Sequence, residues 1–544
     1  MGGIASTLRT SYLNIRVVLA DLATANKDFN ALLTRLNNPI LPIPNPSTSY
    51  WQQHPPFPEL VDIKSPALPS SADIVIIGSG ISGASIAYTL LTQTQDQSAT
   101  REPCRVVLFE ARNICSGATG RNGGHIKCAT YADYASFKSR FGRERARKML
   151  EFERRALPLL VGFAETEGLA RAEAREVETV DVITDAGMWE KTKEMVRDLK
   201  VDVPDAGEEV EVFERELGCE KFGLDPGQCY GVVRYRAGAL WPYRFVTSLY
   251  ARLLSEFGSR FSIETNTPAT GIETREGSGM PFVVSTPRGE IRASHVIHAT
   301  DASVANLVPG TIAKIFPMRG HMTAQTPGDG LPYLDGSRSW SIMGRRGFDY
   351  ITQRPGRPGD SEDGLGGELM VGGGVVQSPG QGIDEFGVWR DDQMSGPISA
   401  YLDGIMPVIF GRERWGQDSH GTRIKQAWTG CMGFTADLLP YVGKLEPGLT
   451  GRGVTYRPGS ATGVEQDQVP PGEWISAGFN GEGMVLAWLC GVAVGLMALG
   501  LDDKKHDGCV GIPPGTVKDW LPEEFICSKR RVDRSDVTEL GLLL

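Results

Sequence analysis

The segment Ala72–Leu91 constrains the fold of this chain more than any other stretch. A short run of β-branched residues, Ile74–Ile77, leads into a Gly-x-Gly-x-x-Gly pattern, and a run of small and apolar residues follows. This strand–turn–helix order is the context that a dinucleotide-binding fingerprint requires. The sequence therefore predicts an α/β fold in which the first βα unit binds a nucleotide cofactor.

Each glycine of this pattern has a physical role. Gly78 permits the tight turn, Gly80 lets a pyrophosphate approach the backbone, and Gly83 lets the helix pack closely on the strand. The first turn of the helix, with Ile81 and Ser82, presents free N–H groups and the positive end of the helix dipole. We expect these residues to form the phosphate-binding part of the site.

Length, charge and cysteine content limit the classes of protein to which this chain can belong. A chain of 544 residues predicts two or more domains with large cores. A net charge of −10 argues against a nucleic-acid partner. The nine cysteines include no C-x-x-C pair, which favours reduced thiols, no bound metal and an intracellular protein. We expect a cytoplasmic location, with an organelle as the open alternative, because the first residues do not resemble a secretory signal.

One apolar stretch has two interpretations. Met484–Leu501 contains no charged residue and reaches the lower limit of a transmembrane helix, about 18 residues. It also contains several glycines and alanines, which are more typical of a helix packed tightly in a protein core. We therefore expect a buried helix and no membrane partner.

A second strand is expected at Val106–Phe109, and it ends at Glu110. An acid at this position accepts hydrogen bonds from the ribose hydroxyls of a dinucleotide. Glu110 lies farther from Gly83 than the usual ~20 residues. The polar stretch Thr92–Arg105 explains the excess as an enlarged loop.

A second glycine-rich loop follows Glu110. A nicotinamide-binding unit does not need such a loop, whereas a flavin needs one with small side chains along its pyrophosphate and ribityl chain. An ordinary surface loop is the alternative. The residues expected to contact a flavin here are Ala111, Arg112, Ser116, Gly117, Ala118, Thr119, Arg121, Asn122, Gly123 and Gly124.

Four later motifs follow in order: His295–Asp301, Pro317–Gly320, Trp428–Gly443 and Ala477–Met484. Together with the fingerprint and the second loop, they resemble the D-amino-acid oxidase superfamily of FAD-dependent oxidoreductases. The pattern is most similar to the glycine/sarcosine oxidase and gamma-glutamylputrescine oxidase branch. The resemblance implies further FAD contacts at Ala269, Ala299, Thr300, Gly478, Phe479, Asn480, Gly481, Glu482, Gly483 and Met484.

The resemblance also implies the activity and the domain order. It implies oxidation of a C–N bond of an amine by hydride transfer to flavin N5, with oxygen as the acceptor. It implies a Rossmann-like FAD-binding domain interleaved with an α+β substrate domain that has an antiparallel sheet. The expected FAD-binding segments are 71–135, 231–315 and 425–505, and the last of them contains a surface insertion at 443–473. The expected substrate segments are 136–230, which includes a helical cap, and 316–424. An N-terminal extension 1–70 and a C-terminal tail 506–544 complete the chain.

The last motif has a physical rationale of its own. Its glycines bring backbone close to a ring, and the apolar helix begins immediately afterwards. The N-terminus of this helix is expected to face the pyrimidine edge of the flavin, where reduction places negative charge that a helix dipole stabilises.

The mode of FAD attachment is open in the sequence. In the sarcosine and fructosyl-amine oxidases, which the stretch Trp428–Pro440 resembles, a nearby cysteine bonds to the flavin. Cys431 lies close to that position but one residue nearer Thr435. We favour non-covalent FAD beside a buried thiol, with a covalent link to Cys431 as the alternative.

Candidate substrate residues are orienting groups, because flavin amine oxidation does not strictly require an acid–base side chain. His125 and Lys127 follow the flavin loop, and His125 is expected to titrate near neutral pH and to govern the protonation of the amine. Tyr350 and Gln353 lie in an expected substrate-domain strand, and Lys425 is a candidate for assisting oxygen reduction. A purely structural or solvated role is the alternative for each.

The sequence departs from the sarcosine-oxidase branch at two positions. A substrate-binding lysine of that branch is replaced by Val485, and a frequent histidine is replaced by Glu482. If Glu482 faces the substrate, it favours a cationic amine. The competing functions are a tailoring desaturase of a bulky metabolite, a flavoprotein dehydrogenase, a non-catalytic redox sensor and an NAD-dependent reductase.

Overall fold

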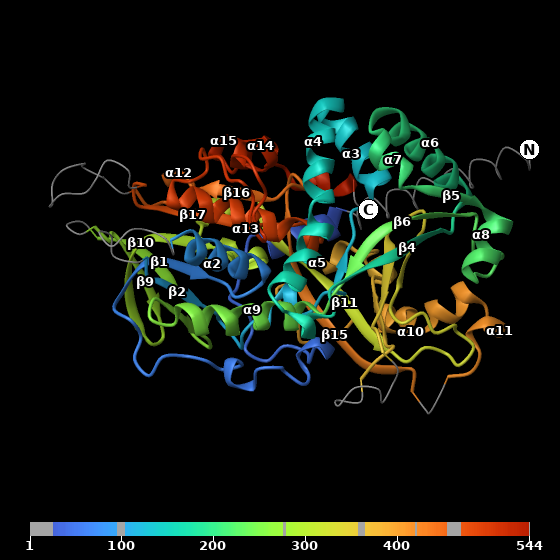
Figure 1. The fold of residues 1–544 in the computed structure, drawn as a ribbon, viewed down its shortest axis with the longest axis horizontal. Coiled ribbons are helices and arrows are strands. Elements are labelled where there is room, and N and C mark those ends of the chain that lie inside the picture. Colours follow the sequence, from blue (N-terminus) through green and yellow to red (C-terminus); the bar gives the residue numbers. More distant parts are fainter. Residues whose placement is uncertain are drawn as a thin grey trace, which may run out of the picture.

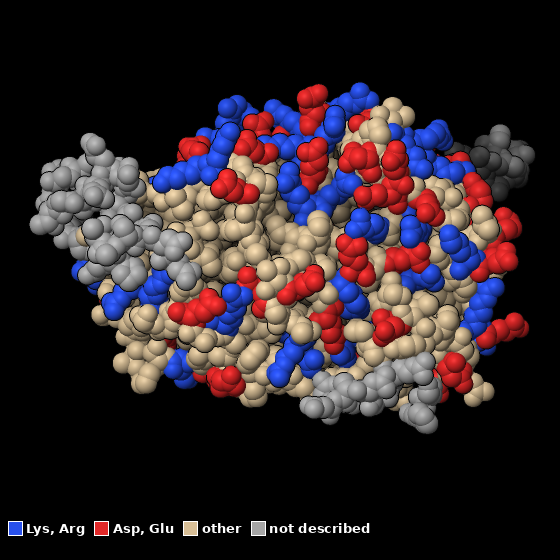
Figure 2. Space-filling view, viewed as in Figure 1, with Lys and Arg blue, Asp and Glu red and all other residues tan. Residues whose placement is uncertain are grey.

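Two β-sheets with their covering helices lie side by side along the long axis of the molecule (Figure 1). The computed structural model describes residues 26–94, 104–275, 279–356, 365–418, 422–453 and 469–542. On the face shown in Figure 2, acidic and basic side chains are interspersed. The expected α/β fold, with a second, largely antiparallel sheet, is confirmed.

The first sheet has the topology of a doubly wound nucleotide-binding fold. Strand β1 (Ser71–Ile77) pairs in parallel with β2 (Val106–Phe109) on one side and with β10 (Gly289–His298) on the other. The parallel set is completed by β7 (Phe261–Glu264) beside β2 and β17 (Gly472–Ala477) beside β10. The antiparallel strands are β16 (Tyr441–Lys444), β9 (Phe282–Thr286) and β8 (Gly271–Thr274). The order reverses at β1, which is where such folds bind ligands.

Two glycine-containing helices pack closely against this sheet. Helix α2 (Ile81–Gln93) follows β1, and helix α13 (Gly483–Leu499) lies against α2. A Cβ atom on Gly491 would lie 1.9 Å from Oγ of Ser85, so only glycine permits this helix spacing. The small residues of α13 therefore serve packing, and the expected buried helix is confirmed. Among the described residues, no helix has the length and apolarity that crossing a bilayer demands.

The second sheet is antiparallel except for one pair. Its order is β15 (Ile424–Thr435), β11 (Ile315–Gln325), β14 (Leu369–Gly372), β13 (Phe348–Gln353), β12 (Arg338–Met343), β4 (Arg175–Ile183), β6 (Gly231–Ala239) and β3 (His125–Ile126), with β5 (Glu211–Glu214) beside β6. Strands β4 and β12 run parallel. Strand β14 ends at Gly372, because Gly373 and Gly374 adopt positive φ angles and turn the chain.

The remaining helices cover the sheets or connect their strands. Their bounds are α3 (Thr130–Phe141), α4 (Arg143–Arg154), α5 (Ala156–Thr166), α6 (Ala186–Asp202), α7 (Pro204–Glu208), α8 (Arg215–Phe222), α9 (Pro242–Phe257), α10 (Gly396–Phe410), α11 (Arg412–Trp415), α12 (Pro447–Thr450), α14 (Val517–Trp520) and α15 (Lys529–Arg534). Helix α9 packs on α2, and α3 and α6 pack on each other.

Several expected segment boundaries differ from the sheets. Strands β3, β6 and β15 belong to the second sheet, although the expected boundaries place them in FAD-binding segments. The expected insertion 443–473 includes parts of β16 and β17, where Glu473 is buried, while 454–468 lie outside the described residues. The C-terminal segment is packed and not a free tail, since Arg531 forms an ion pair with Asp437.

Candidate functional site

A cavity of about 790 Å³ is lined by residues of both sheets. Its nucleotide side contains the carboxyl ends of β1 and β2 and the N-terminus of α2. This is the position at which doubly wound sheets bind cofactors. Its other side contains residues of β3, β12 and β13. The arrangement brings a nucleotide-type site and a second binding region into one space.

The fingerprint residues occupy the cavity wall as a backbone cradle. Gly78, Gly80, Ile81 and Ser82 line the cavity, whereas Gly83 does not. A Cβ on Gly83 would lie 2.0 Å from the carbonyl oxygen of Gly78. Gly83 therefore acts by letting helix and turn pack together, and the other residues leave space for a pyrophosphate.

Glu110 lies at the cavity wall, where its carboxylate is held from two directions. It accepts hydrogen bonds from the backbone nitrogen and Oγ of Ser79, at 3.2 and 2.5 Å. Its second oxygen accepts from the backbone nitrogen of Arg112 at 3.0 Å. A fixed carboxylate at this position is suited to accept hydrogen bonds from ribose hydroxyls. That Glu110 binds the ribose stays a prediction.

The second glycine-rich loop also faces the cavity. Its lining residues are Ala111, Arg112, Gly117, Ala118, Thr119, Arg121, Asn122 and Gly123. Ser116 and Gly124 are not among them. Ser116 instead accepts hydrogen bonds from Arg112, and Gly124 has a φ of +66° beside the carbonyl of Leu240. Both hold the loop in shape.

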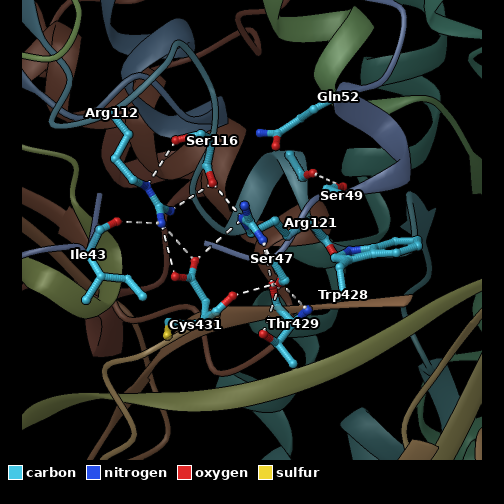
Figure 3. Close-up of polar contacts among 12 residues, drawn as sticks. Ile43, Ser47, Ser49, Gln52, Arg112, Ser116, Arg121, Trp428, Thr429 and Cys431 are labelled. Atoms are coloured by element: carbon cyan, nitrogen blue, oxygen red, sulfur yellow. Dashed lines mark hydrogen bonds and ion pairs between the residues drawn. The ribbon is translucent and has the colours of Figure 1, made fainter. Parts of the chain in front are cut away.

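An arginine–aspartate–arginine cluster braces this loop. The guanidinium groups of Arg112 and Arg121 point toward each other (Figure 3). Asp391, between β14 and α10, lies 3.0 Å from Nη1 of Arg112 and 3.5 Å from Nε of Arg121. All three side chains are buried, and burial lowers the pKa of Arg121 to about 10. Asp391 was not predicted from the sequence, because no motif marks a single acid in this segment.

A second missed acid joins the later motifs. Asp301 accepts hydrogen bonds from the backbone nitrogens of Gly433 at 2.6 Å and Gly478 at 2.9 Å. Burial raises the pKa of Asp301, and its backbone adopts a φ of +47°. It is the last residue of the motif His295–Asp301, which begins within β10, so its position was recognised from the sequence but its role was not.

The last motif brings the start of α13 to the cavity. Lining residues from this motif and from the adjoining strand ends are Ala269, Ala299, Thr300, Phe479, Asn480, Gly481, Glu482, Gly483 and Met484. Gly478 is not among them. It packs against Thr435, whose Cγ2 atom would lie 2.3 Å from an added Cβ. The positive end of the α13 dipole is thus available to a bound anion.

Cys431 lines the cavity from β15 with a protonated thiol. Its Sγ lies 3.4 Å from the carbonyl oxygen of Val388. Burial and nearby Asp391 raise the pKa of the thiol to about 12. The geometry brings the sulfur to the cavity but disfavours the thiolate form.

Three of the candidate substrate residues line the cavity. Nε2 of His125 lies 3.0 Å from Oγ of Ser339, and burial lowers the pKa of this histidine well below its ordinary value. Tyr350 lies near His125, with ring centroids 6.4 Å apart. Nζ of Lys127 lies 2.7 Å from Oδ1 of the buried Asp181. His125 is therefore neutral and does not titrate near pH 7 as expected, and the charge of Lys127 is balanced.

Gln353 and Lys425 are not among the cavity-lining residues. Nζ of Lys425 lies 2.7 Å from the carboxylate of Glu368, and Gln353 is buried near Gly367. The alternation of β13 directs Tyr350, and not Gln353, to the cavity. The structure therefore gives no support to a role of Lys425 beside a flavin, because its ammonium group serves a buried carboxylate elsewhere.

Three carboxylates share the second side of the cavity. They belong to Asp133 on α3, Glu153 on α4 and Glu482 before α13. Among the described residues, none of the three takes part in an ion pair. Burial raises the pKa of Asp133 to about 7, and burial together with the charge of Asp133 raises that of Glu482 to about 8. The pKa of Glu153 is also raised, by burial and by the charges of Asp133 and Glu482. Only Glu482 of this set was predicted from the sequence.

Comparison with known proteins relates the chain to flavoenzymes. The family model described as FAD dependent oxidoreductase (DAO) matches residues 73–495. A probable oxidoreductase of Rhizobium meliloti (strain 1021), OrdL, is 24% identical over 463 residues, covering 83% of this chain and 90% of that protein.

Solved structures share the fold at low identity. Glycine oxidase from Geobacillus kaustophilus has a TM-score of 0.55 and 17% identity, covering 79% of this chain and 95% of its own. L-proline dehydrogenase from P. horikoshii has a TM-score of 0.58 and 19% identity, covering 86% of this chain and 100% of its own. L-amino acid deaminase from Proteus myxofaciens in complex with anthranilate has a TM-score of 0.55 and 16% identity, covering 84% of this chain and 95% of its own.

Proposed function

The chain belongs to the family of FAD-dependent oxidoreductases, and we propose that it oxidises a C–N bond of a cationic amine. The observation that carries this proposal is a cavity that joins the nucleotide side to three carboxyl groups without an ion pair among the described residues. Bound FAD supplies the hydride acceptor, and the chain supplies binding and orientation.

The residues present fit a flavin dinucleotide. Gly78 and Gly80 line the cavity with backbone alone, and Gly78 cannot carry a side chain because a Cβ there would lie 2.3 Å from the carbonyl oxygen of Ala299. Glu110 supplies a fixed carboxylate for the ribose, and the loop 117–123 is expected to follow the ribityl chain. The N-terminus of α13 stabilises negative charge on the ring.

The carboxylate wall supports a cationic substrate. Asp133, Glu153 and Glu482 have no cationic partner among the described ion pairs, whereas Lys127 is balanced by Asp181. A substrate ammonium group supplies the missing charge and releases the repulsion among the acids. In its ionised form Asp133, whose pKa is raised to about 7, also accepts the proton that an amine loses before its C–H bond faces the flavin.

We further propose that FAD is bound without a covalent link and that oxygen is the electron acceptor. The raised pKa of Cys431 supports the first point, because the thiolate is the reactive form. The wider prediction of a small-molecule amine substrate in an intracellular, cytoplasmic protein follows from the sequence.

One experiment tests the function in three steps. Absorbance near ~450 nm in the purified protein is expected from bound flavin. Acid precipitation is expected to release the colour into the supernatant, whereas a yellow pellet would establish covalent FAD. Mono- and diamines are then screened for anaerobic bleaching of the flavin and for peroxide in air.

The outcomes separate the alternatives. Bleaching by amines with peroxide formation supports the oxidase, and bleaching without peroxide supports a dehydrogenase. No bleaching by any amine, but bleaching by a polycyclic metabolite, would overturn amine oxidation in favour of a tailoring desaturase.

A further inference from the structure

A short N-terminal segment, residues 43–52, lies against the second glycine-rich loop. We call it the N-terminal strap. It precedes residues 73–495, which the family model matches. Its side chains Ser49 and Trp51 are 0% and 2% exposed, so the end of the strap, residues 49–51, is buried in the protein. None of its residues is among those that line the cavity, so it reaches the loop from outside.

The strap supplies hydrogen-bond donors to carbonyls of the loop. Ser49 Oγ donates to the carbonyl of Gly120 at 2.7 Å, and Trp51 Nε1 donates to that of Asn122 at 2.5 Å. The carbonyl between them, that of Arg121, accepts from Trp428 Nε1 at 2.7 Å. Three consecutive peptide units thus have fixed orientations, and the loop cannot rotate without losing buried hydrogen bonds.

Ser47 connects the strap to the arginine–aspartate–arginine cluster. Its Oγ accepts hydrogen bonds from the backbone nitrogen of Thr429 at 2.9 Å and from Nη1 of Arg121 at 3.3 Å (Figure 3). One hydroxyl group therefore links the strap to the loop and to β15 at the same time.

Ser47 also fixes the acid of this cluster. Its backbone nitrogen and its Oγ donate to the carbonyl of Asp391, at 2.8 and 2.7 Å. The carboxylate of Asp391 is in turn fixed by Arg112 and Arg121. Both arginines and Asp391 line the cavity. A change in the strap is therefore transmitted to groups that line the cavity, although the strap itself does not line it.

From these contacts we propose that the N-terminal strap is a cofactor-positioning element, which pre-orders the second glycine-rich loop for FAD and slows FAD release. The inference rests on the use of FAD in the proposed function and not on the identity of the substrate. A loop that is already ordered loses less conformational entropy when a ligand binds, so the bound state is favoured.

The test compares single substitutions within the strap. Ser49→Ala and Trp51→Phe each remove one donor to the loop, and Trp51→Phe keeps an aromatic ring beside Trp241. Tyr50→Phe is the matched control, because the Tyr50 hydroxyl is buried in the same strap but contacts Arg354 and not the loop. The FAD release rate of each holoprotein is measured by the rise of flavin fluorescence, together with the visible spectrum and the melting temperature.

We expect Ser49→Ala and Trp51→Phe to release FAD about tenfold faster, which corresponds to about 1.4 kcal/mol. The FAD release rate of Tyr50→Phe is expected to stay within about twofold of the wild-type rate, although its melting temperature falls by a similar amount to that of the other two variants. Equal release rates in all three variants would overturn the proposal and make the strap merely structural. A wild-type protein without flavin absorbance would instead overturn the proposed function.

Discussion

Gly123 lies directly against the ring of Tyr350. A Cβ atom on Gly123 would lie 2.3 Å from Cε2 of this ring. Gly123 belongs to the second glycine-rich loop and Tyr350 to β13 of the second sheet, so the contact joins the two sides of the cavity. A glycine is required here because the ring occupies the place of a side chain.

The contact predicts coupling between the two residues. Gly123→Ala is expected to displace the ring and to lower the free energy of unfolding by about 1–3 kcal/mol, the usual cost of overpacking. In Gly123→Ala/Tyr350→Ala the obstacle is gone, so the double variant is expected to be more stable than the sum of the single changes implies. Chemical unfolding of the four proteins gives the coupling energy, and strict additivity would contradict the assignment.

A second prediction concerns the fingerprint. Gly83→Ala places a methyl group 2.0 Å from the carbonyl oxygen of Gly78, so α2 must move away from the turn. We expect loss of most bound FAD and a lower melting temperature. Gly162→Ala in α5 is the control, because, apart from its chain neighbours and the backbone of its own helix, no atom lies within 4 Å of its added Cβ. This change is expected to preserve FAD and to stabilise the protein by about 0.5–1 kcal/mol, since alanine favours a helix. FAD content per protein, read from absorbance, decides the comparison.

A third prediction concerns Lys425. Because its ammonium group pairs with Glu368 away from the cavity, Lys425→Met is expected to leave flavin reoxidation by oxygen within about twofold of wild type. The change leaves the buried Glu368 without one of its cationic partners, so the melting temperature is expected to fall. Stopped-flow reoxidation of the reduced protein measures the rate. A tenfold slower reoxidation would restore the role that the sequence suggested.

The nucleotide side of the site was predictable because its requirements are local. The pattern at Gly78–Gly83 and the loop after Glu110 need small residues at fixed spacing, and such spacing is visible in a sequence. Asp391 was not predictable in this way. It reaches Arg112 and Arg121 from a segment far along the chain, and only tertiary structure brings them together.

The substrate side shows the same limit. The alternation of β13 distinguishes Tyr350 from Gln353 only when the face that meets the cavity is known. Likewise, Asp133 and Glu153 lie on separate helices, and no sequence pattern around them indicates that they line the same cavity as Glu482. The domain boundaries were displaced for a related reason: β6 and β15 pair with partners distant in sequence, so composition does not reveal their sheet.

The last prediction uses the pH dependence of Glu482. Its surroundings contain Asp133 on α3, Glu153 on α4, Lys127 and Tyr350. Burial and the charge of Asp133 raise its pKa to about 8 from an ordinary 4.5. Between these values the folded protein holds a proton that the unfolded chain releases, so the free energy of unfolding falls as pH rises.

Glu482→Gln removes this proton exchange. We expect the melting temperature of the variant, relative to wild type, to increase from about pH 5 to about pH 8. Glu144→Gln is the control, because Glu144 is exposed and takes part in none of the ion pairs among the described residues. The difference in melting temperature between Glu144→Gln and wild type is expected to stay constant over the same pH range. A difference for Glu482→Gln that also stays constant would show that this carboxyl group does not hold a proton in the folded protein that the unfolded chain releases.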